Sequence, residues 1–219
     1  MDFSLNGERK TFDGDPEMSL LTYLREIEGV TSLKNGCAPQ AACGACTADL
    51  NGKAVLSCVI PMKNVQGGQV TTLEGIGDYR RDVFSRAFVS KGGVQCGFCI
   101  PVIVMRANTL INQNPDPTLQ DIEQNLTPNL CRCTGYKKVI ESIQLAADTI
   151  RREENLSPEP VKAGVGERAS KYQGKNLVLG QHEYVDDIRI PGLVFGALKF
   201  SDHPRAIVKK IDVKKAERL

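Results

Sequence analysis

The sequence lacks the features that direct a chain into or across a membrane. Its 219 residues contain no run approaching the 18 or more apolar residues of a membrane span, and the N-terminal stretch MDFSLNGERKTF has no signal-peptide pattern. An excess of one charge is also missing, because 28 Lys and Arg residues balance 26 Asp and Glu residues. We therefore expect a cytoplasmic protein, with no electrostatic reason for a nucleic acid or a membrane surface as partner.

Histidine is scarce, whereas cysteine is plentiful. The two histidines, His182 and His203, lie far along the chain from the cysteines, and a lone histidine is more often a surface or core residue than a metal ligand. The chain has eight cysteines. In a reducing compartment, neighbouring thiols are more often metal ligands or redox groups than disulfides. The sequence therefore points to thiolate chemistry.

Residues 1–75 have the pattern of a small mixed sheet with one helix. Alternating apolar residues around Asn6-Gly7 and again around Asn51-Gly52 predict two tight hairpins, and residues 70–73 predict a further strand. Between the hairpins, Asp15 as N-cap and Pro16 as first helical residue predict a helix that ends at Gly29.

Residues 76–155 change to helical periodicity. Apolar residues in register predict helices over residues 81–90 and 101–112, and a capping-box pattern at Thr118 predicts a third. A fourth is predicted over residues 135–153. The expected fold class is α+β, with a sheet domain followed by a compact four-helix domain.

The remaining residues look like an unfinished domain. Residues 156–165 are predicted to be a linker because Pro and Ser are frequent in the stretch NLSPEP. Residues 193–200 and 206–213 have the pattern of strands. Since residues 166–219 are too few to bury a core of their own, we expect them to begin a longer domain.

Four cysteines form a first group with the spacing C-x5-C-x2-C-x11-C: Cys37, Cys43, Cys46 and Cys58. Plant-type [2Fe-2S] sites use C-x4-C-x2-C followed by a distant fourth cysteine. The chain departs from that pattern by one extra residue in the stretch 38–42, which contains no glycine. The alternatives are a zinc site with four thiolates and a set of unrelated buried cysteines.

The other four cysteines form a second group with the spacing C-x2-C-x31-C-x1-C: Cys96, Cys99, Cys131 and Cys133. By itself the first pair could be a thioredoxin-like redox pair. The second pair, at the start of the fourth predicted helix, can meet the first across the helices and complete a site with four thiolates. Such a site favours an iron-sulfur cluster or zinc over a hard cation.

The stretches GCAPQAACGACTADLNGKAVLSC, VQCGFCIP and NLCRCTGY make residues 1–155 resemble the iron-sulfur part of the molybdenum hydroxylases, the xanthine dehydrogenase and aldehyde oxidoreductase family. The resemblance implies a ferredoxin-like β-grasp domain with one [2Fe-2S] cluster over residues 1–75. It implies a helical domain with a second cluster over residues 76–155. The tail, residues 166–219, resembles the beginning of the molybdopterin-binding large domain.

The resemblance also implies an electron path and the partners of the chain. Electrons released by substrate hydroxylation at molybdenum would enter the cluster of the second cysteine group and leave through that of the first group to an external acceptor. Gln95 matches the family position that hydrogen-bonds the pterin, and Cys133 matches the ligand that lies against it. No catalytic residue is expected here, because the substrate-converting site belongs to the large domain or subunit. Flavin (FAD), if used, would lie on a partner subunit.

Two sequence motifs of the tail suggest a substrate. VGER and EYVDDI are similar to the flavin-free, selenium-dependent xanthine dehydrogenases, which implies a purine such as xanthine. A segment of an aldehyde oxidoreductase is one alternative, and a zinc-stabilised interaction module with two four-cysteine sites is another. A free-standing ferredoxin-like carrier is a third, against which the unclosed tail argues.

Overall fold

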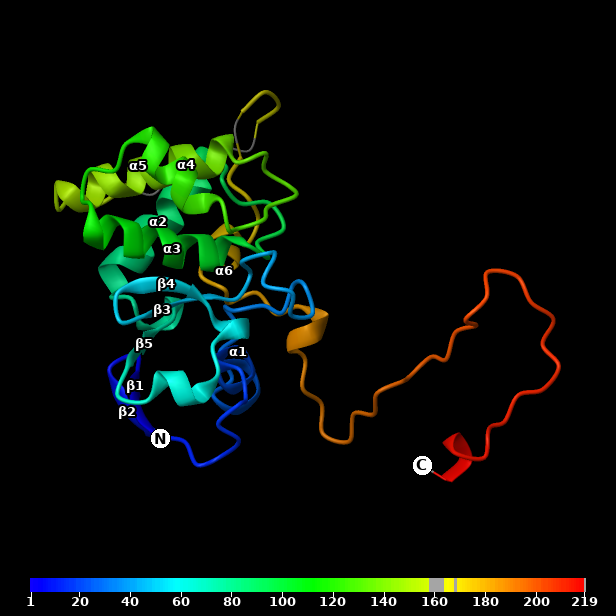
Figure 1. Ribbon diagram of the computed structural model, residues 1–219. Coiled ribbons are helices and arrows are strands. Elements are labelled where there is room, and N and C mark those ends of the chain that lie inside the picture. Colours follow the sequence, from blue (N-terminus) through cyan, green and yellow to red (C-terminus); the bar gives the residue numbers. More distant parts are fainter. Residues whose placement is uncertain (158–163, 168, 219) are drawn as a thin grey trace. The chain divides into compact units, whose positions relative to one another are not determined.

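The computed structural model describes residues 1–157, 164–167 and 169–218 (Figure 1). The chain divides into two compact units, Met1–Asp187 and Ile188–Leu219. Over the described residues, no helix is long and apolar enough to cross a membrane. All eight cysteines lie in the first unit.

The N-terminal domain is built on a mixed sheet. Its five strands are β1 (Asp2–Leu5), β2 (Glu8–Thr11), β3 (Thr47–Leu50), β4 (Lys53–Leu56) and β5 (Gln69–Thr71). The strand order is β2-β1-β5-β3-β4, with β5 parallel to β1 and antiparallel to β3. Both predicted hairpins are confirmed, since Asn6-Gly7 and Asn51-Gly52 each place two successive residues at positive φ, as a tight primed turn requires.

The predicted helix start at Asp15 is wrong. Helix α1 (Leu20–Thr22) begins four residues later than predicted, with Ser19 as its N-cap, whose hydroxyl accepts from the Thr22 amide at 3.1 Å. It continues as a π-helical turn, η1 (Tyr23–Ile27). The reason is pairing with a distant segment: residues 18–20 exchange backbone hydrogen bonds with residues 60–62. This pairing keeps the chain extended up to the cap.

The four predicted helices of the second domain are confirmed: α2 (Asp78–Lys91), α3 (Ile100–Gln113), α4 (Leu119–Leu126) and α5 (Lys137–Arg151). Thr118 and Asp121 form the predicted capping box at the start of α4. Helix α2 packs against α5, and α3 packs against both α4 and strand β3. Figure 1 shows the helices above the sheet, with α3 beside the β3–β4 hairpin.

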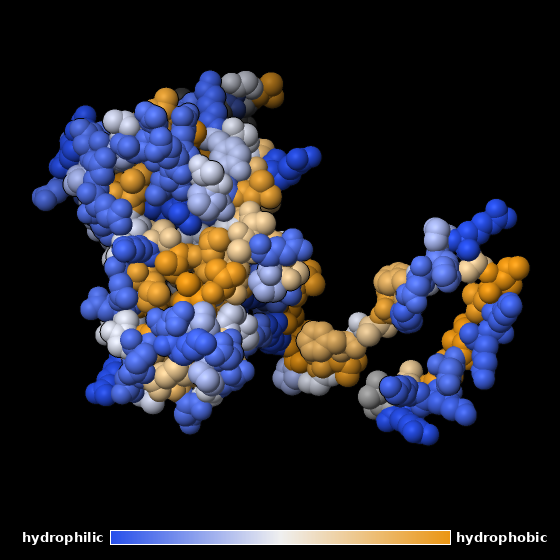
Figure 2. Space-filling model, in the orientation of Figure 1, coloured by the Kyte–Doolittle hydropathy of each residue, from blue (hydrophilic) through white to orange (hydrophobic). Residues whose placement is uncertain are grey.

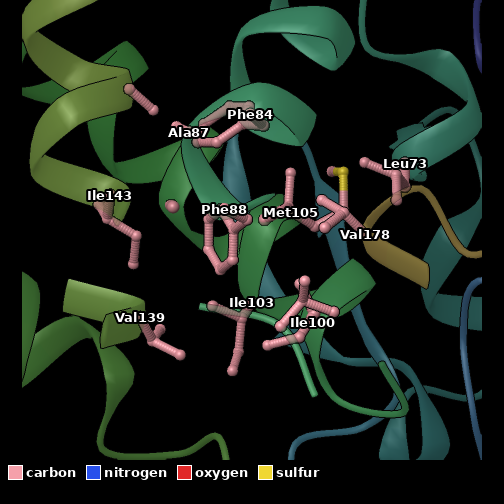
Figure 3. Close-up of a cluster of buried hydrophobic side chains, with 14 of the residues drawn as sticks. Leu73, Phe84, Ala87, Phe88, Ile100, Ile103, Met105, Val139, Ile143 and Val178 are labelled. Carbon is pink, nitrogen blue, oxygen red and sulfur yellow. The ribbon is translucent and has the colours of Figure 1, made fainter. Parts of the chain in front are cut away.

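The core of the helical domain is apolar and fully enclosed. Phe88 of α2 is 0% exposed and lies between Ile143 of α5 and Ile103 of α3 (Figure 3). Val178 of a further helix, α6 (Gly174–Val178), closes the same cluster near Met105. The sequence did not predict α6, which packs against α2 and α3.

The tail differs from its prediction in one respect. Residues 193–200 and 206–213, predicted as strands, have no regular secondary structure and pair with no other strand in the described part of the second unit. A strand needs a neighbouring edge for its N–H and C=O groups, and residues 188–218 supply none. Their apolar side chains are exposed, as Figure 2 shows along this segment.

The predicted linker, residues 156–165, lies partly outside the described residues, because residues 158–163 are not among them. Residues up to Asp187 belong to the unit that carries the cysteines. The assignment of residues 166–219 to the start of a large domain stays a prediction.

Candidate metal centres

The first cysteine group lies on the loop between η1 and β3, and the β3–β4 hairpin brings its fourth member to that loop. Cys58 sits in a 3-10 turn, η2 (Ser57–Val59), directly after β4. The Ser57 hydroxyl and amide both donate to the Cys46 carbonyl, at 2.7 and 3.2 Å. The thiols of Cys46 and Cys58 also hydrogen-bond each other, and burial raises the pKa of Cys46 to about 11.

The other two thiols of this group face backbone amides. Hydrogen bonds from the amides of Ala42, Gln40 and Cys43 lower the pKa of Cys37 to about 7, with Gln40 N at 3.2 Å from its sulfur. Cys43 lies in hydrogen-bonding contact with Cys37. The structure also shows how the extra loop residue is accommodated, since Ala38 and Ala41 both take φ of 55°. Two alanines thus adopt the left-handed conformation that glycine usually supplies.

The second cysteine group joins two loops of the helical domain. Cys96 and Cys99 lie just before α3, with Cys99 as its N-cap. Cys131 and Cys133 lie on the loop before α5, slightly ahead of the helix start that the sequence predicted. The sulfurs of Cys133 and Cys96 are 3.5 Å apart.

The inner half of this site is buried. Cys99 and Cys131 hydrogen-bond each other and are each 7% exposed, and burial raises the pKa of Cys99. At Cys131, burial is outweighed by hydrogen bonds from Thr134, so its pKa is lowered. The Tyr136 hydroxyl accepts from the Cys131 amide at 2.8 Å and donates to a carbonyl of the same loop at 3.0 Å. Tyr136 therefore fixes the shape of the ligand loop through two hydrogen bonds to its backbone.

Both groups consist of two thiol pairs. In the described part of the chain, no three His, Cys, Asp or Glu side chains converge closely enough for a single metal ion. The pairs are Cys37 with Cys43, Cys46 with Cys58, Cys96 with Cys133, and Cys99 with Cys131. Because each iron of a [2Fe-2S] cluster binds two thiolates and shares two sulfides, this arrangement of donors fits that cluster.

The structure brings Gln95 and Cys133 together. The Gln95 amide nitrogen donates to the Cys133 carbonyl at 3.0 Å, and both residues are exposed, as is Cys96. The two residues assigned to the pterin by resemblance therefore share one outward-facing edge of the second site. This edge is the part of either site that is most open to another molecule.

The two ligand loops meet directly. The Leu130 amide donates to the Cys43 carbonyl at 2.9 Å, which joins the residue before Cys131 to a member of the first group. Asn129, 1% exposed, donates to the Gly44 carbonyl at 3.0 Å. A cavity of about 300 Å³ between the loops is lined by cysteines of both groups. Sequence reasoning missed Asn129, whose only signal is a polar residue two positions before Cys131.

Comparison with known proteins gives two family models that match in succession. The model described as "2Fe-2S iron-sulfur cluster binding domain" matches residues 3–67, and that described as "[2Fe-2S] binding domain" matches residues 72–144. The nicotinate dehydrogenase small FeS subunit of Eubacterium barkeri is 38% identical over 149 residues, which cover 68% of this chain and 94% of that subunit.

Longer relatives match over a small part of their length. Xanthine dehydrogenase of Dictyostelium discoideum is 36% identical over 188 residues, covering 78% of this chain and 14% of the relative. Aldehyde oxidoreductase of Megalodesulfovibrio gigas is 40% identical over 151 residues, covering 67% of this chain and 16% of the relative. The chain thus spans less than a fifth of these two proteins.

Solved structures of related oxidoreductases also align with most of this chain. Aldehyde oxidoreductase from Desulfovibrio gigas aligns with a TM-score of 0.77 and 33% identity, over 85% of this chain and 22% of that one. Quinoline 2-oxidoreductase from Pseudomonas putida 86 aligns with a TM-score of 0.64 and 32% identity, over 70% of this chain and 96% of that one. The chain carries two successive [2Fe-2S] domains and belongs to the iron-sulfur subunits and segments of the molybdenum hydroxylase family.

Proposed function

We propose that the chain passes electrons from a molybdopterin centre on a partner domain or subunit to an external acceptor. Two [2Fe-2S] clusters would be held by Cys37, Cys43, Cys46 and Cys58 and by Cys96, Cys99, Cys131 and Cys133. When bound, each cluster supplies a site that takes up and releases one electron. The observation that supports this role best is the hydrogen bond of 2.9 Å from the Leu130 amide to the Cys43 carbonyl.

The exposed edge of the second site supports the direction of electron flow. Gln95, Cys96 and Cys133 are exposed, whereas Cys99 and Cys131 are buried in the core of the helical domain. A pterin held by a partner would contact Gln95 and Cys133, so electrons would enter at the second site. They would leave through the first site to an acceptor, with FAD on another subunit if flavin is used. A cytoplasmic location stays a prediction from the sequence.

For the substrate we propose a nitrogen-containing aromatic ring. The proteins that this chain covers almost entirely are named for nicotinate and quinoline. The sequence motifs of the tail favour a purine such as xanthine within that class. An aldehyde is the second candidate, because the match to aldehyde oxidoreductase covers 85% of the chain, more than the two cluster domains contain.

The test uses the chain purified anaerobically together with its co-expressed molybdopterin partner. Xanthine, nicotinate and benzaldehyde are added separately, and rapidly frozen samples are examined by EPR. A Cys131→Ser variant identifies the signal of the second site, and Cys58→Ser that of the first. We expect a ring substrate, and not the aldehyde, to reduce both sites of the wild-type protein, and the first site to stay oxidised in the Cys131→Ser variant. Reduction of the first site in that variant at the wild-type rate would contradict the proposed direction.

A further inference from the structure

A short segment far from the cysteine motifs, residues 184–187, contacts both cysteine-bearing domains at once. On the helical side, the Tyr184 hydroxyl donates to the Cys96 carbonyl at 2.6 Å. Its ring packs edge-on against Phe98, with centroids 5.7 Å apart. A Cβ on Gly97, which has φ of 83°, would lie 3.1 Å from the Tyr184 hydroxyl oxygen. Tyr184 therefore lies tightly against the loop that carries the first pair of the second group.

On the sheet side, Asp187 forms a buried ion cluster. Its carboxylate lies 2.5 Å from the Lys34 ammonium nitrogen and 3.0 Å from a guanidinium nitrogen of Arg25. The Lys34 and Asp187 side chains are each 2% exposed and that of Arg25 is 5% exposed. The Lys34 amide in turn donates to the Ala45 carbonyl at 2.8 Å, inside the loop of the first group.

The two halves of this segment are locked to each other. The Tyr184 amide donates to the Asp187 carboxylate at 3.1 Å, and the Asp187 amide donates to the Tyr184 carbonyl at 2.8 Å. The Lys34 ammonium also lies 4.8 Å from the centre of the Tyr184 ring, a cation–π contact. Tyr184, Asp187 and Lys34 thus form one closed unit that spans the two ligand loops.

We propose that Tyr184 and Asp187 are positioning residues that clasp the two ligand loops together and fix the spacing and environment of the two cluster sites. This inference rests on the proposed electron-transfer function. A buried ion cluster is stable in one geometry only, because any displacement leaves a buried charge without its partner. The hydroxyl bond to the Cys96 carbonyl transmits that geometry to the second site, where hydrogen bonding around the ligands sets the potential.

The test compares Tyr184→Phe and Asp187→Asn with matched controls at exposed positions, Tyr172→Phe and Asp202→Asn. Tyr172 is 79% exposed and the Asp202 side chain is 82% exposed. Each full-length variant is purified anaerobically, its iron content is measured, and EPR-monitored redox titrations give the midpoint potential of each signal. The Phe substitution keeps the ring packing, so the protein retains its fold while losing one hydrogen bond.

We expect Tyr184→Phe to lower the midpoint potential of the second site and to leave the first unchanged, because the Cys96 peptide loses a donor. Asp187→Asn should change the splitting that two reduced clusters impose on each other's signals, since their spacing is no longer fixed. The proposed positioning role of Tyr184 and Asp187 is refuted if wild-type protein shows two signals and both variants match their controls in midpoint potential and signal splitting. A wild-type protein without two signals refutes the proposed function itself.

Discussion

Replacing Gly44 by alanine tests how tightly the two ligand loops are packed. Gly44 follows Cys43 and has φ of 67°, a conformation that L-residues rarely adopt. A Cβ at this position would lie 2.2 Å from the Pro128 carbonyl oxygen and 2.9 Å from the Asn129 Cα atom. Both are backbone atoms of the helical domain, so they cannot rotate away.

Three effects add to the cost of Gly44→Ala. The left-handed conformation costs an alanine about 1–2 kcal/mol, and overpacking costs about 1–3 kcal/mol. Displacing the loop also breaks the hydrogen bond from Asn129 to the Gly44 carbonyl, worth about 1 kcal/mol. We expect the free energy of unfolding to fall by roughly 3–6 kcal/mol, a large share of the stability of a domain.

The matched control is Gly52→Ala in the β3–β4 turn. Gly52 has φ of 78° but no atom within 4 Å of an added Cβ, so only the conformational cost of about 1–2 kcal/mol remains. Anaerobic unfolding in urea, followed by circular dichroism and by visible absorbance, measures both variants. Equal losses at Gly44 and Gly52 would refute the tight contact between the ligand loops.

Two further predictions concern the fold around the sites. Thr118→Ala should lower the free energy of unfolding, measured in urea, by about 0.5–2 kcal/mol, because it removes the hydroxyl that accepts from the Asp121 amide at 3.2 Å. The control, Thr118→Ser, should retain this helix cap. Equal losses of stability in the two variants would contradict the role of the cap. Burial, together with a hydrogen bond to Glu28, raises the pKa of Tyr23 above its ordinary value of 10.0, so its stabilising contribution is complete below pH 10 and is lost as the pH rises beyond that. Thermal unfolding should therefore decline less between pH 9 and pH 11 in Tyr23→Phe than in wild type, and an identical decline would contradict the burial of Tyr23.

Local signals in the sequence were sufficient for the elements that close on themselves. Asn6-Gly7 predicts its hairpin because both residues tolerate positive φ, and Thr118 with Asp121 marks a helix start within four residues. The start of α1 could not be predicted in this way, because it depends on pairing with residues 60–62. Helix α6 was missed for the same reason, since its apolar residues are buried by α2 and α3.

The candidate sites, too, could be predicted from the sequence only where local patterns determine them. Cysteine spacing separates the two groups of four, but it carries no information on how the loops are held. Asp187 pairs with Arg25 across 162 positions of the chain, and no local pattern marks either residue. The left-handed conformation of Ala38 and Ala41 could not be predicted either, because alanine gives no sequence signal for positive φ.

We propose that the eight cysteines hold two [2Fe-2S] clusters that carry electrons. The most direct test is to purify the chain anaerobically, quantify iron and zinc, and record EPR spectra after reduction with dithionite. We predict about four irons per chain and two distinct S = 1/2 signals, as two clusters with four cysteine ligands each require. Zinc in place of iron, with no EPR signal, would contradict the account.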